Sequence, residues 1–382
     1  MKARRTWWGL AAAAAVAAAA CSEGTAPQLS NPQQLNSDIQ TVAAVFEAPV
    51  FQSFGAVGTA PGSPAAAPTV PGAALFRATI PAAPPGPGQA YAATPQRLQA
   101  LRAAAAGMSP TNTAGVIPSQ YLGKTYVWDV TTHAYVVGPD AGPSNGVRII
   151  LYQVDANGNV IEPTVAVGFV DLLDLSDANT NKLQVIVKSG TPASPGTTYA
   201  DYTVSATVTK NGAGVVSEFT ATASGFVSDG TRRLDFTAQF HATNLDTDNP
   251  DAQIDVTWAL NTPPVSVGLH ETISTPDATH LTLTINLSVA RGGGDTVVLD
   301  GTITVDASGA TTSVTADLTI TVNGQVFAII SGTDAGITIR HPDGSALSQT
   351  ELQALASLFQ LPDHLEGVIE NLFHPCERLM GG

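Results

Sequence analysis

Side chains that could do chemistry are sparse in this 382-residue chain, and their spacing matches few known arrangements. The run HETIS, which begins at His270, starts like the His-Glu-x-x-His motif of zinc helices but has Ser274 where the second histidine is required. The sequence has no Cys-x-x-Cys pair and no Ser-x-x-Lys pattern around its lysines. We therefore assign no catalytic residue and no cofactor, and we expect a protein that is not an enzyme.

Three histidines fall on the polar side of alternating patterns, at His241, His270 and His280. The last two belong to neighbouring segments, and we expect them to lie diagonally across the turn TPDA. Two imidazoles without a nearby carboxylate or a third ligand make a poor metal site, so this pattern favours exposed surface. Glu271 interrupts the apolar side of its own segment. A buried carboxylate there would have a raised pKa, but we expect the strand to fray or bulge instead.

A cluster of acidic side chains offers the nearest approach to a metal site. Asp246, Asp248 and Asp251 gather in the run NLDTDNPD, and hard carboxylate oxygens suit calcium. They are weak calcium candidates, and a solvated turn is the favoured interpretation, so no metal is assigned. The run DANGN at residue 155 resembles the start of a calcium loop, but Val160 stands where glycine is required, which favours a hairpin turn.

The N-terminus carries the clearest signal for localisation. The apolar run from Trp7 to Ala20 follows Lys2, Arg4 and Arg5 and is shorter than the roughly 17–25 residues of a spanning helix. This pattern is typical of a secretory signal peptide. The residues AAAC at 18–21 resemble the lipobox of bacterial lipoprotein precursors, although leucine is commonest where Ala18 stands.

That resemblance implies cleavage before Cys21, a diacylglycerol on its thiol and acylation of the new amine, by a fatty acid such as palmitate. Ser22 at the next position favours the outer membrane of the cell envelope. Plain secretion after ordinary cleavage remains open. Two or more acyl chains anchor a protein stably, so the predicted partner is the membrane, reached through the N-terminal lipid. Cys376 would then lack a partner within the chain, and its role stays open.

Charge restricts the other partners. Loss of residues 1–20 leaves 13 basic against 31 acidic residues, a formal net charge of −18 instead of −15. Nucleic-acid binding requires basic patches that neutralise phosphates, so we expect no nucleic-acid partner. An apolar small ligand or another envelope protein is compatible with this composition.

The elements before residue 116 are predicted to be helical or irregular. After a signal peptide (1–20) and a tether (21–30), apolar residues at helical spacing predict a helical segment over 31–54, opened by Asn31 and Pro32. The range 55–94 is rich in proline, alanine and glycine and reads as a linker or irregular wrap. A short helix is expected over 95–107.

From residue 116 to 340 the apolar period changes to two, which predicts an antiparallel β domain. LTLTINLSV, for example, places five apolar side chains on one face, from Leu281 to Val289, and four polar ones on the other. Turn signals such as Asn157-Gly158 separate the runs, and each run is longer than an average strand. Ser348 and Glu351 form a capping-box pattern at the start of C-terminal helices over 346–375.

These elements predict a mainly β fold: one curved antiparallel meander or incomplete barrel, covered by the N- and C-terminal helices. Tandem Ig-like β-sandwiches are the other arrangement compatible with the turn spacing. The predicted function is a cell-envelope lipoprotein with a non-catalytic binding or structural role, holding an apolar ligand between sheet and helices. A secreted adhesion or scaffold module is the competing prediction. No ligand-binding residue can be named from the sequence.

Overall fold

The computed structural model describes residue 29 and the ranges 32–45, 48–58, 60–64, 116–178, 180–277, 279–309 and 312–356. The signal peptide, Cys21, the expected helix at 95–107, Cys376 and most of the 55–94 tract lie outside the described residues, as does the end of the C-terminal helical segment. The sequence-based expectations for these parts stay predictions.

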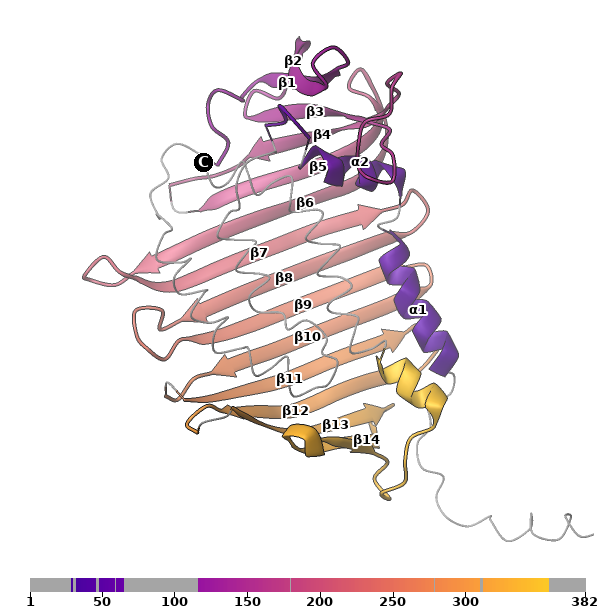
Figure 1. The fold of residues 1–382 in the computed structure, drawn as a ribbon, viewed down its shortest axis with the longest axis vertical. Helices are drawn as coiled ribbons and strands as arrows, with labels where there is room; N and C mark the ends of the chain where they lie inside the picture. The colour runs from indigo at the N-terminus through magenta and orange to yellow at the C-terminus, as the bar shows by residue number, and fades with distance from the viewer. Residues whose placement is uncertain are drawn as a thin grey trace, which may run out of the picture.

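A single sheet of 15 strands dominates the described residues (Figure 1). Its order is β15 to β3 in sequence, followed by β1 and then β2, so the sheet has two free edges and does not close. The strands are β1 (Lys124–Asp129), β2 (Ala134–Ala141), β3 (Gly146–Tyr152), β4 (Ala166–Asp174), β5 (Asn181–Thr191), β6 (Ser194–Lys210), β7 (Val216–Ser228), β8 (Arg233–Thr243), β9 (Asp251–Asn261), β10 (Pro264–Ser274), β11 (His280–Arg291), β12 (Thr296–Asp306), β13 (Ser313–Val322), β14 (Gln325–Thr333) and β15 (Thr338–Arg340).

The predicted alternation is confirmed. In β11 the five apolar side chains from Leu281 to Val289 are buried, and the polar ones between them are exposed or half-buried. The same alternation holds along β8 and β13. Because side chains of a strand alternate between its two faces, this pattern gives the sheet one apolar and one polar face.

The prediction of a single curved sheet is confirmed, and the competing tandem sandwiches are wrong, since the strands join one continuous ladder. The meander is not purely antiparallel, however. Strand β3 pairs in parallel with β1, which lies between β2 and β3. The connection from β2 to β3 therefore crosses the start of β1. Gly142 allows this close crossing, because a Cβ atom there would collide with the backbone oxygen of Lys124.

A second glycine, in β7, makes room for aromatic side chains from the two neighbouring strands. Gly225 in β7 has φ of +148° and lies between Tyr202 of β6 and Phe236 of β8 in the ladder. The two rings contact each other across the glycine, with centroids 5.9 Å apart. A Cβ atom at residue 225 would collide with the backbone of Tyr202. The absent side chain thus lets the aromatic rings cover the sheet at this point.

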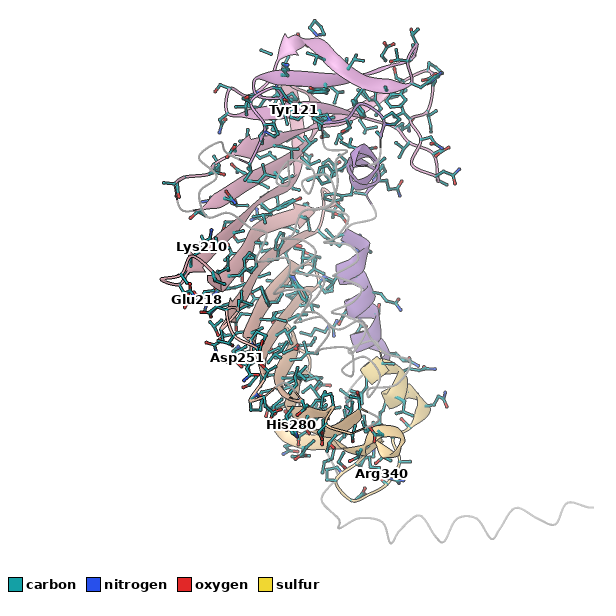
Figure 2. All side chains as sticks on the ribbon, turned by 60° about the vertical axis from the view of Figure 1, so that its left-hand side comes forward. Tyr121, Lys210, Glu218, Asp251, His280 and Arg340 are labelled. Atoms are coloured by element: carbon teal, nitrogen blue, oxygen red, sulfur yellow. The ribbon has the colours of Figure 1, made fainter. Side chains whose placement is uncertain are left out.

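Two N-terminal helices and a C-terminal helix lie on the concave side of the sheet (Figure 2). The predicted helical segment is divided into α1 (Pro32–Ala44) and α2 (Pro49–Val57). Pro49 explains the break, because proline lacks the N–H of a helix interior but suits a first turn. In α2, Val50, Phe51 and Phe54 are buried as expected, and the helix contacts β3 and β4.

The C-terminal helix occupies 349–356 within the described residues. Its predicted capping box is confirmed: the Ser348 N–H donates to Glu351 Oε2 at 2.8 Å, and the Glu351 N–H donates to Ser348 Oγ at 3.3 Å. Leu355 is buried as predicted, but Leu352 is 41% exposed, so the predicted apolar stripe is only partly confirmed. None of the described helices is long and apolar enough to cross a membrane.

Helix α1 is joined to the sheet by a charged contact. The Asp38 carboxylate, which is buried, lies 2.7 Å from Nε of Arg291 at the end of β11. The Gln34 side chain also donates a hydrogen bond to Asp38 at 2.9 Å. Removal of one partner would leave a buried charge unpaired, which is costly.

Candidate ligand pocket

An open pocket of about 440 Å³ lies between α2 and the end of the sheet formed by β1 and β2. Its size falls in the range of roughly 300–1,000 Å³ that small-molecule sites occupy. Apolar and polar groups share its wall. The lining residues are Ser53, Ala56, Val57, Ala60, Pro61, Trp128, His133, Tyr135, Val154, Asn157, Gly158, Asn159, Val160 and Glu162.

Three segments that are distant in the sequence build this wall. The β1–β2 hairpin brings Trp128, His133 and Tyr135, and the segment 153–162 brings the turn at Asn157 and Gly158. The chain after α2 then reaches the hairpin, where the Tyr135 N–H donates to the Pro61 oxygen at 2.8 Å. The pocket thus lies where α2, the loop at 153–162 and the edge strands β1 and β2 meet.

The predicted turn at Asn157 and Gly158 is confirmed, with one difference in geometry. A bridge between Val154 and Val160 closes it, but only Gly158 has a positive φ, +82°. The Asp155 carboxylate accepts hydrogen bonds from the backbone N–H groups of Asn159 and Asn157. These bonds lower the pKa of Asp155. The calcium-like spacing at 155 is therefore used for turn formation, as expected.

Glu162 is the acidic group of the pocket. Its Oε1 accepts a hydrogen bond of 3.0 Å from the Trp128 indole N–H, and His133 Nδ1 lies at the same distance from that oxygen. The bond from Trp128 lowers the pKa of Glu162 most; partial desolvation opposes it, and His133 adds a smaller lowering. Glu162 is therefore ionised at neutral pH, with its side chain 32% exposed.

A row of aromatic rings extends from the Trp128 indole that binds Glu162. The ring of Trp128 meets that of Tyr135 edge to face, with centroids 5.5 Å apart, and Tyr135 in turn contacts Tyr152. The Tyr135 hydroxyl donates to the Ile150 oxygen at 3.0 Å, and burial raises the pKa of Tyr135. Such edge-to-face contacts fix ring positions, so the indole that holds Glu162 is itself held in place.

The three histidines singled out in the sequence lie on the polar face, apart from the pocket. The expectation that His270 and His280 lie diagonally across their turn is wrong. His270 pairs with Asn286, six residues along β11 from His280, which corresponds to about 20 Å.

Each of these two histidines has a carboxylate neighbour that the sequence did not suggest. His270 Nδ1 lies 2.6 Å from Asp255 Oδ1 across the β9–β10 pair. Desolvation raises the pKa of Asp255, but the bonds from His270 and Gln253 outweigh it, so the pKa is lowered. Both members of the His270 pair are substantially exposed.

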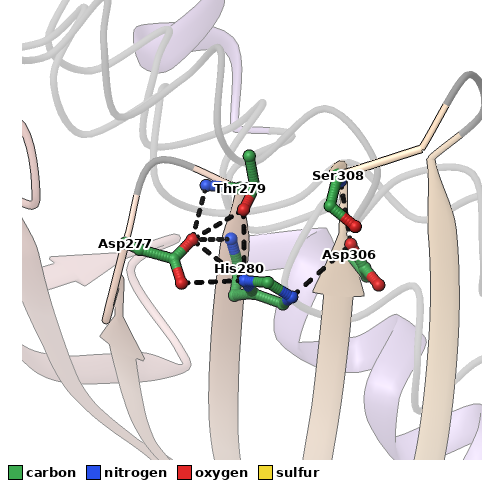
Figure 3. Close-up of polar contacts among 5 residues, drawn as sticks. All are labelled: Asp277, Thr279, His280, Asp306 and Ser308. Carbon is green, nitrogen blue, oxygen red and sulfur yellow. Dashed lines mark hydrogen bonds and ion pairs between the residues drawn. The ribbon is translucent and has the colours of Figure 1, made fainter.

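His280 lies between two carboxylates at the ends of β10, β11 and β12 (Figure 3). Its Nδ1 is 2.8 Å from Asp277 Oδ2, and its Nε2 is 3.6 Å from Asp306 Oδ1. The hydrogen bond to Asp277 raises the pKa of His280, while bonds from Thr279 and His280 lower that of Asp277. Because all these groups are exposed, the cluster forms a polar turn contact on the surface.

The calcium candidates are engaged in turn contacts. Asp246 accepts a hydrogen bond from Asn211 at 2.8 Å, and Asp251 accepts one from Asn244 at 2.9 Å. Asp248 also has a bonded neighbour. Within the described ranges, no group of three or more histidine, cysteine, aspartate or glutamate side chains could hold a metal ion. The interpretation as a turn is the one that these contacts support.

The expectation for Glu271 is wrong. Strand β10 neither frays nor bulges there: its ladders to β9 and β11 run through Glu271 without a shift in register, and the residue is only 3% exposed. Long ladders on both sides hold the backbone, so the carboxyl group is carried into the apolar face.

The chain also contains the spacing Gly-x-Ser-x-Gly, at residues 142–146. In hydrolases this motif places the serine between a strand and a helix. Here it joins β2 to β3, and Ser144 is exposed on a turn between two strands. Its glycines serve packing instead, since a Cβ at Gly146 would collide with the Leu172 oxygen, as one at Gly142 would with Lys124.

The pocket itself was not anticipated from the sequence. Trp128 was recognised only as a large apolar anchor, and Asn157-Gly158 only as a turn. The sequence carried no signal that would join His133 to Glu162, which are 29 residues apart. Comparisons of the chain with protein-family models, curated proteins and solved structures find no match, so the pocket is interpreted from its own geometry.

Proposed function

We propose that the protein is a non-catalytic binding protein of the bacterial cell envelope, anchored by lipid and holding a small ligand in the pocket beside α2. The observation that carries this proposal is the pocket of about 440 Å³, whose wall combines an ionised carboxylate, aromatic rings and apolar side chains. Such a combination provides affinity through apolar contact and orientation through a few polar groups.

The proposed site refines the expected one. The sequence predicts an apolar ligand between sheet and helices, and a pocket between α2 and the sheet supports a ligand site in that region. Val57, Val154 and Val160 can contact an apolar body, but Glu162 adds a polar end. The ligand proposed here is therefore amphiphilic rather than purely apolar.

Binding rather than catalysis fits the electrostatics of Glu162. A general acid or base works best with a pKa near the working pH. Hydrogen bonds, led by that from Trp128, lower the pKa of Glu162, which makes it a poor proton donor and a weak base at neutral pH. A fixed negative charge serves recognition better than proton transfer.

The proposed location rests on Cys21 and the lipobox-like AAAC that precedes it. Lipidation there would hold the protein on the membrane, and Ser22 favours the outer one. Cys21→Ser is expected to release the protein from washed membranes into the soluble fraction. Retention of the Cys21→Ser variant on membranes, with residues 1–20 still attached, would contradict the proposed anchor.

The binding role is tested with protein extracted gently from its own envelope and analysed by native mass spectrometry. We expect a mass excess from a small bound molecule. Ala56→Trp should abolish that excess, because Ala56 faces the turn at Gly158, where a Cβ would lie 3.7 Å from Ala56 Cβ. The matched control Ala213→Trp changes an exposed turn elsewhere and should retain the ligand. A wild-type protein without a mass excess, or an equal mass excess for both tryptophan variants, would contradict the proposal.

A further inference from the structure

We propose that the pocket recognises a protonated amine attached to an apolar body, with Glu162 as the group that binds the ammonium. This inference rests on the proposed binding function and specifies the chemical class of its ligand. Three properties of the wall carry it: four of its hydrogen-bond donors are engaged within the protein, its ionised group is negative, and apolar side chains line the same pocket.

Four donors of the wall already have acceptors in the protein. The indole N–H of Trp128 donates to Glu162, and the Tyr135 hydroxyl donates to the Ile150 oxygen. The Ser53 hydroxyl donates to the Pro49 oxygen at 3.1 Å, and the Asn159 side-chain amide donates to Asp155. A ligand that needs donors, such as a carboxylate or phosphate, would find few of them. The wall therefore favours a ligand that donates hydrogen bonds.

The acceptor is available on Glu162. Both described contacts of its carboxylate, from Trp128 and His133, go to Oε1. Among the described residues, Oε2 has no hydrogen bond, and it belongs to a side chain that is one-third exposed. An ammonium at Oε2 would form a charge-assisted hydrogen bond, the stronger kind.

The charges around the pocket point in the same direction. The described residues that line it include no lysine or arginine, and Asp155, within the loop that forms one wall, is a second carboxylate with a lowered pKa. His133 can carry a positive charge, but it is largely exposed to solvent and is already paired with Glu162. An anionic ligand would meet repulsion here, whereas a cation would be attracted.

The rest of the wall fits an apolar body. Val57, Val154 and Val160 line it, and the Trp128 ring offers its π-system, which attracts cations when they lie over its face. The net charge of the chain, −15, adds a long-range attraction for cations.

The test uses the full mature chain and three probes of equal length: n-hexylammonium, its neutral counterpart n-hexanol, and hexanoate. Isothermal titration calorimetry should give a dissociation constant for hexylammonium that is about tenfold lower or more than that for hexanol, as expected for a hydrogen bond to a charged group. Hexanoate should bind more weakly than hexanol. Ala56→Trp should abolish binding of all three probes.

Glu162→Gln tests the residue directly, since glutamine keeps the shape and the acceptor for Trp128 but loses the charge. This variant should reduce the preference for hexylammonium over hexanol to about one. The matched control is Glu218→Gln, which removes the same charge from an exposed position on β7 (Figure 2) and should keep the preference. If Glu162→Gln fails to fold, the comparison of probes on the wild type still decides the question.

The possible outcomes distinguish a failure of the amine inference from a failure of the proposed binding function. Equal affinity for hexylammonium and hexanol, with both blocked by Ala56→Trp, would overturn the amine inference and leave the binding function standing. Persistence of the preference in Glu162→Gln would overturn the role of Glu162. Absence of saturable hexylammonium binding would overturn the inference, while the native mass spectrum alone decides whether the proposed function falls with it.

Discussion

The central strands of the sheet and its β1–β2 end are built differently. From β7 to β13 every strand pairs with the next in an antiparallel ladder without a shift in register. From β1 to β6 the ladders contain a parallel pair and several irregularities. The pocket lies at the irregular end. The regular ladders form a continuous surface, whereas the pocket is formed by α2, the β1–β2 hairpin and the loop at 153–162.

The two regions differ in how strictly side chains follow the alternation of apolar and polar residues. In the regular part each residue is constrained by neighbours on two strands, so its side chain is either in the apolar face or on the polar face. At the irregular end, Trp128, His133 and Glu162 come from a hairpin and a loop, and they form contacts that no alternating pattern specifies. Substitutions in the two regions should therefore affect different properties, stability in the regular strands and binding at the irregular end.

The largest effect is expected for Phe240→Ala in the regular part. Phe240 is 1% exposed and contacts Phe219, with ring centroids 6.0 Å apart. Truncation should lower the free energy of unfolding by about 3–5 kcal/mol through lost burial and a cavity. Urea denaturation measures it, and Val215→Ala, at a position that is 49% exposed, is the control. A loss below about 1 kcal/mol would mean that this face is not a packed core.

Gly225→Ala should have the next largest effect. The new Cβ would collide with the backbone of Tyr202, and φ of +148° strains any side chain. We expect a loss of about 2–3 kcal/mol, typical of overpacking. Gly212→Ala is the matched control, since a Cβ atom at residue 212 would have no other atom of the described residues within 4 Å, apart from its chain neighbours. If the two variants unfold at the same denaturant concentration, the close approach of β6 and β7 is not as described.

Arg148→Met tests a charged contact on β3, near the pocket end. Arg148 binds Asp171 through two hydrogen bonds, at 2.6 and 2.8 Å, and lies 4.9 Å from the Phe169 ring centroid. The Asp171 side chain is only 14% exposed, so its charge would be left largely buried. The expected loss is about 1–3 kcal/mol by thermal or urea unfolding.

The control for that pair is Arg233→Met, which breaks an ion pair with Asp235 whose side chains are about half exposed. Exposed pairs contribute about 0–1 kcal/mol, so this variant should unfold close to the wild type. A larger loss for Arg233→Met than for Arg148→Met would contradict the burial argument.

The smallest effect is a pH dependence at His280. Its raised pKa means that its stabilisation is present below the unfolded value of 6.5 and is lost as pH rises through the folded pKa. The lowered pKa of Asp277 gives stabilisation above 3.8 that is lost as pH falls through its folded pKa. The contact therefore stabilises most between these two values.

Melting temperatures of the wild type and His280→Gln measure this contact. Their difference should be largest near pH 5 and should shrink as the pH rises through the folded pKa of His280. A difference that stays constant across that rise in pH would show that the charge of His280 plays no part.

Much of the sheet could be predicted from the sequence, because alternation is a local signal: Leu281 to Val289 follow it throughout β11. The crossing of β2 to β3 could not be predicted, since it depends on contacts of Gly142 with Lys124 that local periodicity does not encode. Glu271 was misjudged because two long neighbouring ladders outweigh the local preference of a carboxyl group for water. The pocket required knowledge of which loop faces which helix, so Glu162 and His133 could not be joined beforehand.

Ligand binding is proposed to take place at the irregular end of the sheet, with the regular strands as its scaffold. Hydrogen–deuterium exchange with and without n-hexylammonium tests it most directly. We expect slower exchange in 48–58, 60–64, 124–135 and 153–162, with β7 to β13 unchanged. Slower exchange along β7 to β13, with no change around Trp128 and Glu162, would contradict it.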